Sequence, residues 1–224
     1  MNLAYAVMEY APEARFVFVG SSEAYGASFV DAAKVPIKET AALKPMNVYG
    51  ATKAAADILI GQLAYDGLKA IRFRPFNHTG PGQTVDYVVP AFAKQLAEIA
   101  SGVGVPRISV GNLSAYRDFL DVRDVVRAYA DAALNDVTSE VLGGVFNLSS
   151  GRPVQIQSIL DMLIELSGSD VDVEVDPKRL RGSEIAVAAG DNKAAFEALG
   201  WKPEIDLRRT LGDVLEDWKI RIAR

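Results

Sequence analysis

Tyr49 and Lys53 stand four residues apart in the segment VYGATK, and this pair of side chains suits proton-transfer chemistry. On a helix, residues i and i+4 lie on one face within contact distance. A lysine ammonium beside a tyrosine phenol favours the phenolate and lowers a phenol pKa that starts at about 10. Upstream, Ser21 and Ser22 directly follow the apolar segment FVFVG. Ser21, Tyr49 and Lys53 therefore predict a site where a proton is exchanged at an oxygen while hydride moves at the attached carbon.

A second tyrosine–lysine pair with the same spacing, Tyr65 and Lys69, is a weaker candidate. The pair straddles Gly67, where the helix is expected to end, and a solvated helix end explains both residues. Tyr49 instead opens an alanine-rich helix that follows a plausible cap, Asn47. Because spacing alone has little specificity, this context favours the first pair.

Helical and strand patterns alternate along the chain. Helices are expected over 2–14, 47–67, 90–99, 125–134 and 156–168, and strands over 16–19, 69–76, 107–110, 117–122, 144–150 and 171–176. Strands that alternate with helices imply βα units with right-handed connections. The sequence therefore predicts an α/β fold with a doubly wound, mostly parallel sheet, and such sheets bind ligands at the carboxyl ends of their strands.

Three motifs, SSEAYG (21–26), YGATK (49–53) and RPFNHTGPGQ (74–83), resemble in order and spacing the extended short-chain dehydrogenase/reductase family, the NAD-dependent epimerases and dehydratases. This resemblance implies a Rossmann-like sheet with a smaller α/β substrate-binding domain, acting on nucleotide sugars. It also implies that Ser21, Tyr49 and Lys53 are catalytic.

The resemblance further implies NADPH or NADH as the cofactor, contacted by Tyr49, Lys53, Phe76 and His78. Glu23 is a further catalytic candidate, because related dehydratases carry an acid or base at its position; a surface or capping role is the alternative. His78 is the only histidine, and no partners for a metal site accompany it.

The substrate is implied to be a GDP-sugar. An arginine fork matches phosphate oxygens, which favours Arg117 and Arg181 as ligands of the diphosphate. The full set of substrate-binding residues implied by the resemblance is Ser22, Asn77, Val88, Lys94, Arg117, Arg181 and Glu184. Gly182 stands where relatives usually have proline, and it loosens the segment that carries Arg181 and Glu184.

The segments NHTGPGQ (77–83), VVPAFAKQLAEI (88–99) and GNLSAYRDFLDVRDVVRAY (111–129) resemble more narrowly the GDP-4-dehydro-6-deoxy-D-mannose reductases of this family. The implied function is NAD(P)H-dependent reduction of the C4 keto group to give GDP-rhamnose. GPGQ replaces an arginine-rich stretch of the dehydratases, which favours a reductase and leaves NADH versus NADPH open. The alternatives are a GDP-mannose 4,6-dehydratase or another nucleotide-sugar epimerase or dehydratase, and a noncatalytic GDP-sugar-binding or dimerising subunit.

The resemblance also divides the chain. It assigns 1–77, with 118–150 returning to it, to the dinucleotide-binding domain, and 78–117 with 151–224 to the nucleotide-sugar-binding domain. The family begins with a strand, a GxxGxxG turn and a helix that receives the pyrophosphate, and no GxxGxxG pattern occurs here. We therefore expect an N-terminally truncated member that lacks the adenosine and pyrophosphate site and has little activity alone.

The amino-acid composition limits the kinds of partner and the compartment expected for this chain. The net charge of −5 and the scattered basic residues argue against nucleic acid. No apolar run is long enough to span a membrane, and the absence of cysteine fits a cytoplasmic protein. By the resemblance, the segments 2–14 and 49–66 match helices that pair into a four-helix bundle, which predicts a homodimer.

Overall fold

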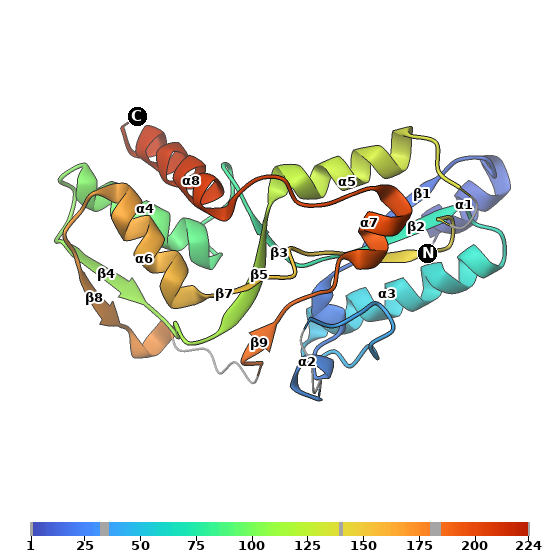
Figure 1. Cartoon of the computed structure of the whole chain (residues 1–224), viewed down its shortest axis with the longest axis horizontal. Coiled ribbons are helices and arrows are strands. Elements are labelled where there is room, and N and C mark those ends of the chain that lie inside the picture. The colour runs from blue at the N-terminus through green and yellow to red at the C-terminus, as the bar shows by residue number, and fades with distance from the viewer. Residues whose placement is uncertain (1, 32–35, 139–140, 180–184, 224) are drawn as a thin grey trace.

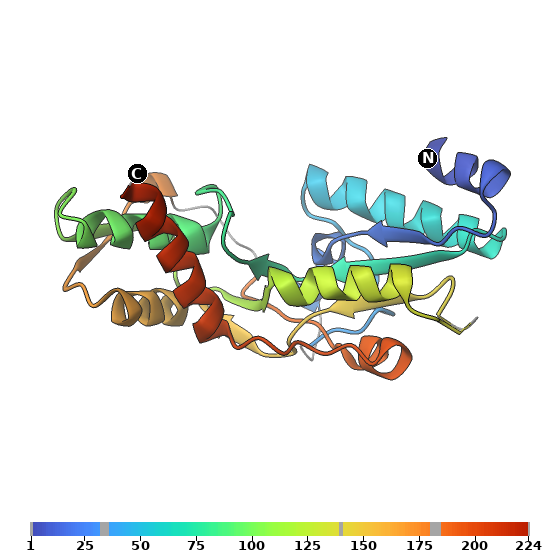
Figure 2. The same cartoon turned by 90° about the horizontal axis from the view of Figure 1, so that it is seen from above.

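The computed structural model describes residues 2–31, 36–138, 141–179 and 185–223. Helices and strands alternate along most of this length (Figures 1 and 2). The expected α/β fold is confirmed. In their described part, the helices include none that is both long enough and apolar enough to cross a bilayer.

A parallel sheet of three strands in the order β1-β2-β6 carries the N-terminal half of the fold. Its strands are β1 (Phe16–Val19), β2 (Ala70–Pro75) and β6 (Val145–Leu148). Figure 1 shows α3 (Val48–Tyr65) and α5 (Val122–Leu134) on opposite sides of this sheet. Helices on both faces explain why β2 is almost wholly apolar or buried, because such strands have no solvent-facing side.

Helix α1 (Asn2–Tyr10) packs on the same face as α3. Ala4 of α1 shares a buried cluster with Ile60 and Leu63 of α3, and Leu68 and Ala70 complete that cluster. Strand β1 forms the edge of the sheet and pairs with β2 in the described part of the chain. Helix α1 and strand β1, which precedes Ser21, thus pack in a small core of their own.

A second group of strands and helices lies at the other end of the molecule (Figure 2). Strand β5 pairs with β3 and β9 in parallel and with β7 in antiparallel fashion, while β4 and β8 form a two-stranded parallel sheet. These strands are β3 (Asn77–Thr79), β4 (Arg107–Val110), β5 (Tyr116–Asp121), β7 (Pro153–Gln155), β8 (Asp172–Val175) and β9 (Val187–Ala188).

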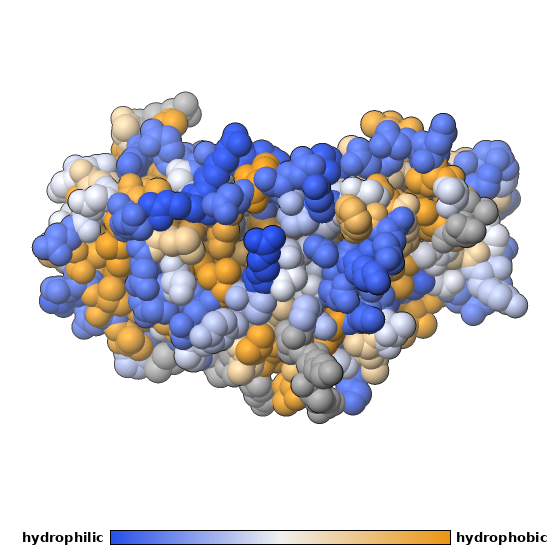
Figure 3. Space-filling view, in the orientation of Figure 1, coloured by the Kyte–Doolittle hydropathy of each residue, from blue (hydrophilic) through white to orange (hydrophobic). Residues whose placement is uncertain are grey.

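Three helices build the core of this second group: α4 (Val88–Ala100), α6 (Ile156–Ser167) and α8 (Leu207–Ile222). Their facing side chains, such as Leu96, Leu163 and Leu211, are fully buried. On the face shown in Figure 3, hydrophobic residues gather over β4, β8 and α6, among polar ones. Shorter elements complete the chain: η1 (Ser22–Ala24), α2 (Ser28–Asp31), η2 (Pro177–Arg179) and α7 (Lys193–Leu199).

The expected elements are present, with shifted ends. The first helix ends at Tyr10 rather than near Ala14, the helix expected from Pro90 begins at Val88, and α5 begins at Val122 directly after β5. The short strands β3, β7 and β9 and the helices α7 and α8 were not predicted. A strand of two or three residues is too short to show a period of two, so its sequence carries no pattern.

Candidate active site

Residues 20–25, which we call the Ser21 turn, follow the carboxyl end of β1 and include η1. Gly20 donates its backbone N–H to the carbonyl of Phe73 at 2.8 Å, and a Cβ at this glycine would lie 2.7 Å from that oxygen. Residue 20 therefore has to be glycine for the chain to stay against β2. The Ser21 hydroxyl then caps η1 by accepting the backbone N–H of Glu23 at 3.1 Å. Ser21 and Ser22 are both buried at the carboxyl edge of the sheet, where parallel sheets generally bind ligands.

Tyr49 and Lys53 lie on one face of the first turns of α3, as predicted. Lys53 Nζ is 5.8 Å from the centroid of the Tyr49 ring and donates to the carbonyl of Val19 at 3.0 Å. The ammonium is thereby tied to the last residue of β1, beside the Ser21 turn. Tyr49 is 55% exposed, so its phenol is open to a ligand. The three residues of the predicted proton-transfer set thus converge at one edge of the sheet.

Helix α3 packs directly on the Ser21 turn. A Cβ at Gly50 would lie 2.6 Å from the carbonyl oxygen of Glu23, so the glycine of the YGATK motif permits this close approach. Asn47 joins the same two elements through its side chain. Its Oδ1 accepts the backbone N–H of Gly50 at 2.7 Å as the helix cap, and its Nδ2 donates to Glu23 Oε2 at 3.0 Å.

Removal of the Asn47 side chain is expected to destabilise the protein. Asn47→Ala removes the helix cap and should lower the free energy of unfolding by about 1 kcal/mol. For a chain of this size that corresponds to a decrease in Tm of about 2–4 °C, measured by calorimetry. Asn47→Ser is the matched control, because its hydroxyl retains the cap while the bond to Glu23 is lost. Equal stability of Asn47→Ala and the parent protein would contradict the role of this cap.

The NHTGPGQ loop is held by its own side chains and by α8. His78 Nδ1 lies 2.9 Å from the carbonyl oxygen of Phe76, and the Thr79 hydroxyl donates to Gln83 Oε1 at 2.7 Å. Gly82 donates its N–H to Asp217 Oδ2 of α8 at 2.9 Å. Phe76, predicted at the cofactor, has its ring buried against Tyr25 and Phe29. The structure therefore places Phe76 in the core, while His78 remains partly accessible.

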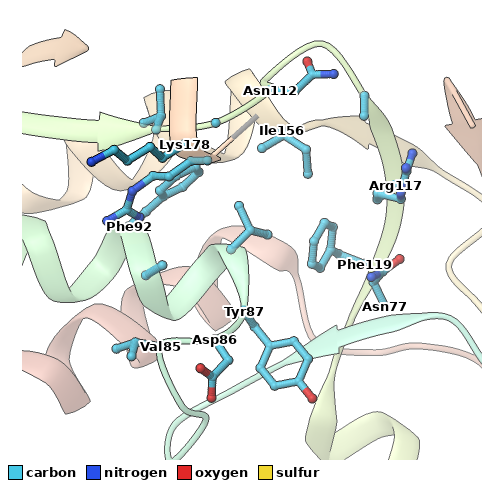
Figure 4. Close-up of a pocket in the computed structure, with 16 residues that line it drawn as sticks. Asn77, Val85, Asp86, Tyr87, Phe92, Asn112, Arg117, Phe119, Ile156 and Lys178 are labelled. Carbon is cyan, nitrogen blue, oxygen red and sulfur yellow. The ribbon is translucent and has the colours of Figure 1, made fainter. Parts of the chain in front are cut away.

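A cavity of about 530 Å³ opens between β5, α4 and the segment after β8 (Figure 4). Its walls mix apolar rings with amide and cationic groups, as ligand sites usually do. Residues on these walls include Asn77, Asp86, Tyr87, Val88, Phe92, Asn112, Arg117, Phe119, Lys178 and Arg179. In Figure 4, Arg117 and Lys178 lie on opposite sides of the cavity, so an anionic ligand inside it would lie between cations.

Arg117 lines this cavity and interacts electrostatically with Glu23 of the Ser21 turn. Its guanidinium donates to the carbonyl of Tyr116 at 2.7 Å. Burial lowers the pKa of Arg117, and the carboxylate of Glu23 opposes that decrease. An arginine nonetheless stays protonated at any physiological pH. The cavity wall thus carries a partly dehydrated cation whose charge interacts with that of Glu23.

Asp118, the next residue of β5, points to the opposite face of the strand and is fully buried. It accepts backbone N–H groups from Ser150 at 2.7 Å, Gly151 at 2.9 Å and Gly190 at 3.3 Å. Burial raises the pKa of Asp118, while these hydrogen bonds oppose the increase. Asp118 therefore connects β5, the strand that carries Arg117, to the segments around Ser150 and Gly190.

The predicted substrate-binding residues fall into four groups. Ser22 is buried in η1 and does not line the cavity. Asn77, Val88 and Arg117 line the cavity together. Lys94 lies farther along α4, does not line the cavity and pairs with Glu98 at 3.4 Å. Arg181 and Glu184 lie outside the described residues.

Most residues that line the cavity were not predicted from the sequence, among them Tyr87, Phe92, Lys178 and Arg179. Lys178 and Arg179 directly follow the strand predicted over 171–176, and a basic pair in that position is the signal that could have identified them. Tyr87 and Phe92 belong to the start of α4, where apolar spacing shows a helix but not which residues face a ligand.

Comparison with known proteins decides the family. The family model described as GDP-mannose 4,6 dehydratase matches residues 1–214. The chain belongs to this family. Its members are NAD(P)-dependent nucleotide-sugar reductases, dehydratases and epimerases.

Individual relatives are similar over nearly the whole chain. The GDP-6-deoxy-D-mannose reductase of Pseudomonas aeruginosa is 33% identical over 99% of this chain and 71% of its own length. The GDP-mannose 4,6-dehydratase of Vibrio cholerae is 27% identical over 92% of this chain, which spans 61% of that enzyme. The structure of RMD from Pseudomonas aeruginosa complexed with NADPH superposes with a TM-score of 0.88 at 32% identity, covering 98% of this chain and 71% of that one.

The residues of this family member fit one end of a nicotinamide dinucleotide. An exposed phenol and an ammonium anchored at the end of β1 are suited to a ribose hydroxyl and to the reacting carbonyl. The 224 residues contain no GxxGxxG turn of the type that receives a pyrophosphate. The fit therefore concerns the nicotinamide ribose.

Proposed function

We propose that this chain serves the NAD(P)H-dependent reduction of GDP-4-dehydro-6-deoxy-D-mannose at C4, which yields GDP-rhamnose. The observation that carries the proposal is the convergence of Ser21, Tyr49 and Lys53 at the carboxyl edge of β1, in a structure that also holds a cavity of about 530 Å³ lined by the cation Arg117. Similarity to a reductase across 99% of the chain supports the same assignment.

The cavity suits the GDP part of the substrate. Arg117 is mounted on a strand that Asp118 fixes, and its planar fork matches the oxygens of a diphosphate. Phe92, Tyr87 and Val88 supply apolar surface suited to a base. We place Asn77 beside the sugar or its phosphate, since it lines the same cavity as Arg117. Arg181 and Glu184 remain proposed ligands of the diphosphate and ribose.

In the proposed mechanism, the chain's own residues position the carbonyl and move a proton. Ser21 donates a hydrogen bond to the C4 oxygen, and Tyr49 transfers its phenolic proton to that oxygen as it becomes a hydroxyl. Lys53 stabilises the resulting phenolate and holds the nicotinamide ribose. NAD(P)H, when bound, supplies the hydride for C4 and leaves as NAD(P)⁺.

Dehydration of GDP-mannose is the second candidate, and Glu23 is the residue that would serve it. The dehydratase of Vibrio cholerae is also similar to this chain. Glu23, however, has its carboxylate engaged by the Asn47 amide at 3.0 Å, and its charge also interacts with that of Arg117. A carboxylate that accepts a hydrogen bond from the helix-capping asparagine suits a positioning role better than proton abstraction, which favours the reductase.

Two substrates distinguish these functions. The keto sugar GDP-4-dehydro-6-deoxy-D-mannose and GDP-mannose are each incubated with the protein and cofactor, and the products are separated by chromatography. A reductase consumes NAD(P)H with the keto sugar and leaves GDP-mannose unchanged. Formation of a keto sugar from GDP-mannose would overturn the proposal and support a dehydratase.

We also propose a homodimer in which α1 and α3 pair with the same helices of a second copy. Both helices expose large apolar residues, including Leu3 (68%), Ile58 (62%) and Tyr65 (89%), which a bundle would cover. Light scattering should give twice the monomer mass, and Ile58→Glu should convert the dimer to a monomer. A monomeric parent protein would refute this interface.

The proposed division of the chain assigns 1–77 and 118–150 to dinucleotide binding and 78–117 with 151–224 to the nucleotide sugar. Separate buried clusters around β2 with α5 and around α4 with α6 and α8 support most of this division, but Ala195 and Trp201 of 151–224 are buried in the first cluster. The cytoplasm is the compartment we propose, because the chain contains no cysteine for disulfides.

A further inference from the structure

Asp57 is a buried carboxylate on the helix that carries Tyr49 and Lys53. The three residues follow one another at intervals of four, so they share one face of α3. Asp57 is only 1% exposed, and its Oδ2 lies 3.5 Å from the position that a Cβ would occupy at Gly20, the residue before Ser21. The carboxylate therefore lies beneath both catalytic elements, yet the proposed mechanism gives it no role.

The guanidinium of Arg74 in β2 forms a bidentate pair of hydrogen bonds with this carboxylate. Its Nε donates to Asp57 Oδ2 at 2.9 Å and its NH2 to Oδ1 at 2.8 Å. Arg72 donates to Oδ1 from the same strand at 3.0 Å. Two parallel hydrogen bonds fix orientation as well as distance. The bidentate pair therefore sets both the height and the rotation of α3 above β2.

The same arginine also contacts the Ser21 turn through Tyr25. Arg74 NH1 donates to the Tyr25 hydroxyl at 2.9 Å, and its guanidinium carbon lies 5.0 Å from the centre of the Tyr25 ring. The Tyr25 hydroxyl donates to Asn147 Oδ1 of β6 at 2.7 Å. Burial raises the pKa of Tyr25 to about 12, so the hydroxyl remains a donor throughout the physiological range.

We propose that Asp57, Arg74 and Tyr25 form a positioning unit that sets the catalytic helix and the Ser21 turn relative to one another. Arg74 contacts α3 through Asp57 and the Ser21 turn through Tyr25, and it is itself fixed in the central strand of the three-stranded sheet. None of the three reaches the substrate in this scheme. The inference rests on the proposed function, because it takes Tyr49, Lys53 and Ser21 as the catalytic set.

A contribution to the stability of the fold does not by itself explain why three polar residues are buried here. A buried ion pair contributes little compared with well-packed apolar residues of the same volume, because removing both charges from water is costly. Apolar side chains would attach α3 to β2 equally firmly, but they would not fix its rotation. Directional hydrogen bonds do, and an error of about 1 Å in the placement of a catalytic group lowers the rate by as much as 10²-fold.

The test compares kcat and KM in Tyr25→Phe, Asp57→Asn and a control, Leu163→Ala. Tyr25→Phe keeps the buried ring and removes the hydroxyl between Arg74 and Asn147, so the fold should survive. Leu163 is buried in the cluster of α4, α6 and α8 and belongs to neither the unit nor the cavity. We expect kcat to decrease about fivefold in Tyr25→Phe and at least tenfold in Asp57→Asn, with KM for the GDP-sugar within twofold.

Hydrogen exchange gives a readout that does not require turnover. Amides of the first turns of α3 and of the Ser21 turn should exchange faster in Tyr25→Phe, whereas those of α4 and α8 should not. In Leu163→Ala the pattern should be reversed and kcat retained. Unchanged kcat and exchange in Tyr25→Phe and Asp57→Asn, or losses equal to those of a control with the same Tm, would overturn the positioning role.

Tyr49→Phe separates this inference from the proposed function. If Tyr49→Phe abolishes ketoreduction while the Asp57 and Tyr25 variants behave as the control, only the positioning unit is wrong. If Tyr49→Phe retains full activity, the proposed function is wrong, and faster exchange restricted to the two catalytic elements would still support the mechanical link.

Discussion

Tyr49→Phe is expected to lower kcat for ketoreduction by about 10²–10⁴-fold, because it removes the proton that the C4 oxygen receives. The ring, its exposed position at the start of α3 and the contact with Lys53 are retained, so KM and Tm should change little. Stopped-flow or steady-state oxidation of NAD(P)H with the keto sugar measures the effect.

Tyr65→Phe is the matched control for this variant. Tyr65 is the last residue of the same helix and is 89% exposed. The substitution removes the same phenolic hydroxyl from a residue that has no proposed role in the site. We expect its kcat to equal that of the parent protein. A Tyr49→Phe variant that retained more than a tenth of the parent's kcat would contradict general acid catalysis by Tyr49.

Arg117→Ala is expected to weaken GDP binding by about 1.5–3 kcal/mol, the contribution of a hydrogen bond to a charged group. This corresponds to an increase in Kd of roughly 10–150-fold, measured by titration calorimetry. Arg117→Lys should recover only part of the affinity, because an ammonium lacks the planar fork that engages two phosphate oxygens.

Lys94→Ala provides the contrast for Arg117. Sequence resemblance places Lys94 at the base, but in the structure it lies outside the cavity and pairs with Glu98. We therefore expect its Kd for GDP to remain within twofold of the parent's. A large loss of affinity in Lys94→Ala with none in Arg117→Ala would reverse the assignment of the cavity.

The long elements were predictable because their signals are local. The apolar run FVFVG forms strand β1, although its side chains are only partly buried, and Asn47 caps α3 as the sequence indicated. The relation of Tyr49 to Lys53 was equally predictable, since a helix fixes the positions of residues i and i+4. These features depend on neighbours in the chain, which is the information that one sequence carries best.

The walls of the cavity were only partly predictable. Val88 and Arg117 line it together with Lys178, which is far away in the sequence, and their meeting depends on how β5, α4 and the segment after β8 pack. The direction of the Phe76 side chain was also not predictable. It lies next to the loop that bears His78, but the strand turns its ring into the core against Tyr25.

The buried unit around Arg74 was also missed. Asp57, Arg74 and Tyr25 lie in three separate segments, and each residue taken alone reads as an ordinary helix, strand or turn residue. Only the fold shows that the two oxygens of one carboxylate meet the fork of one arginine. Long-range polar pairs of this kind have no periodicity from which they could be inferred.

Transfer of deuterium to the substrate tests the central claim most directly. The protein is incubated with the keto sugar GDP-4-dehydro-6-deoxy-D-mannose and NADPH or NADH in which both hydrogens at the nicotinamide C4 are replaced by deuterium, and the product is analysed by NMR. The proposed function predicts GDP-rhamnose with one deuterium at C4 of the sugar and a hydroxyl on the same carbon. Unlabelled product or label at another carbon would contradict it.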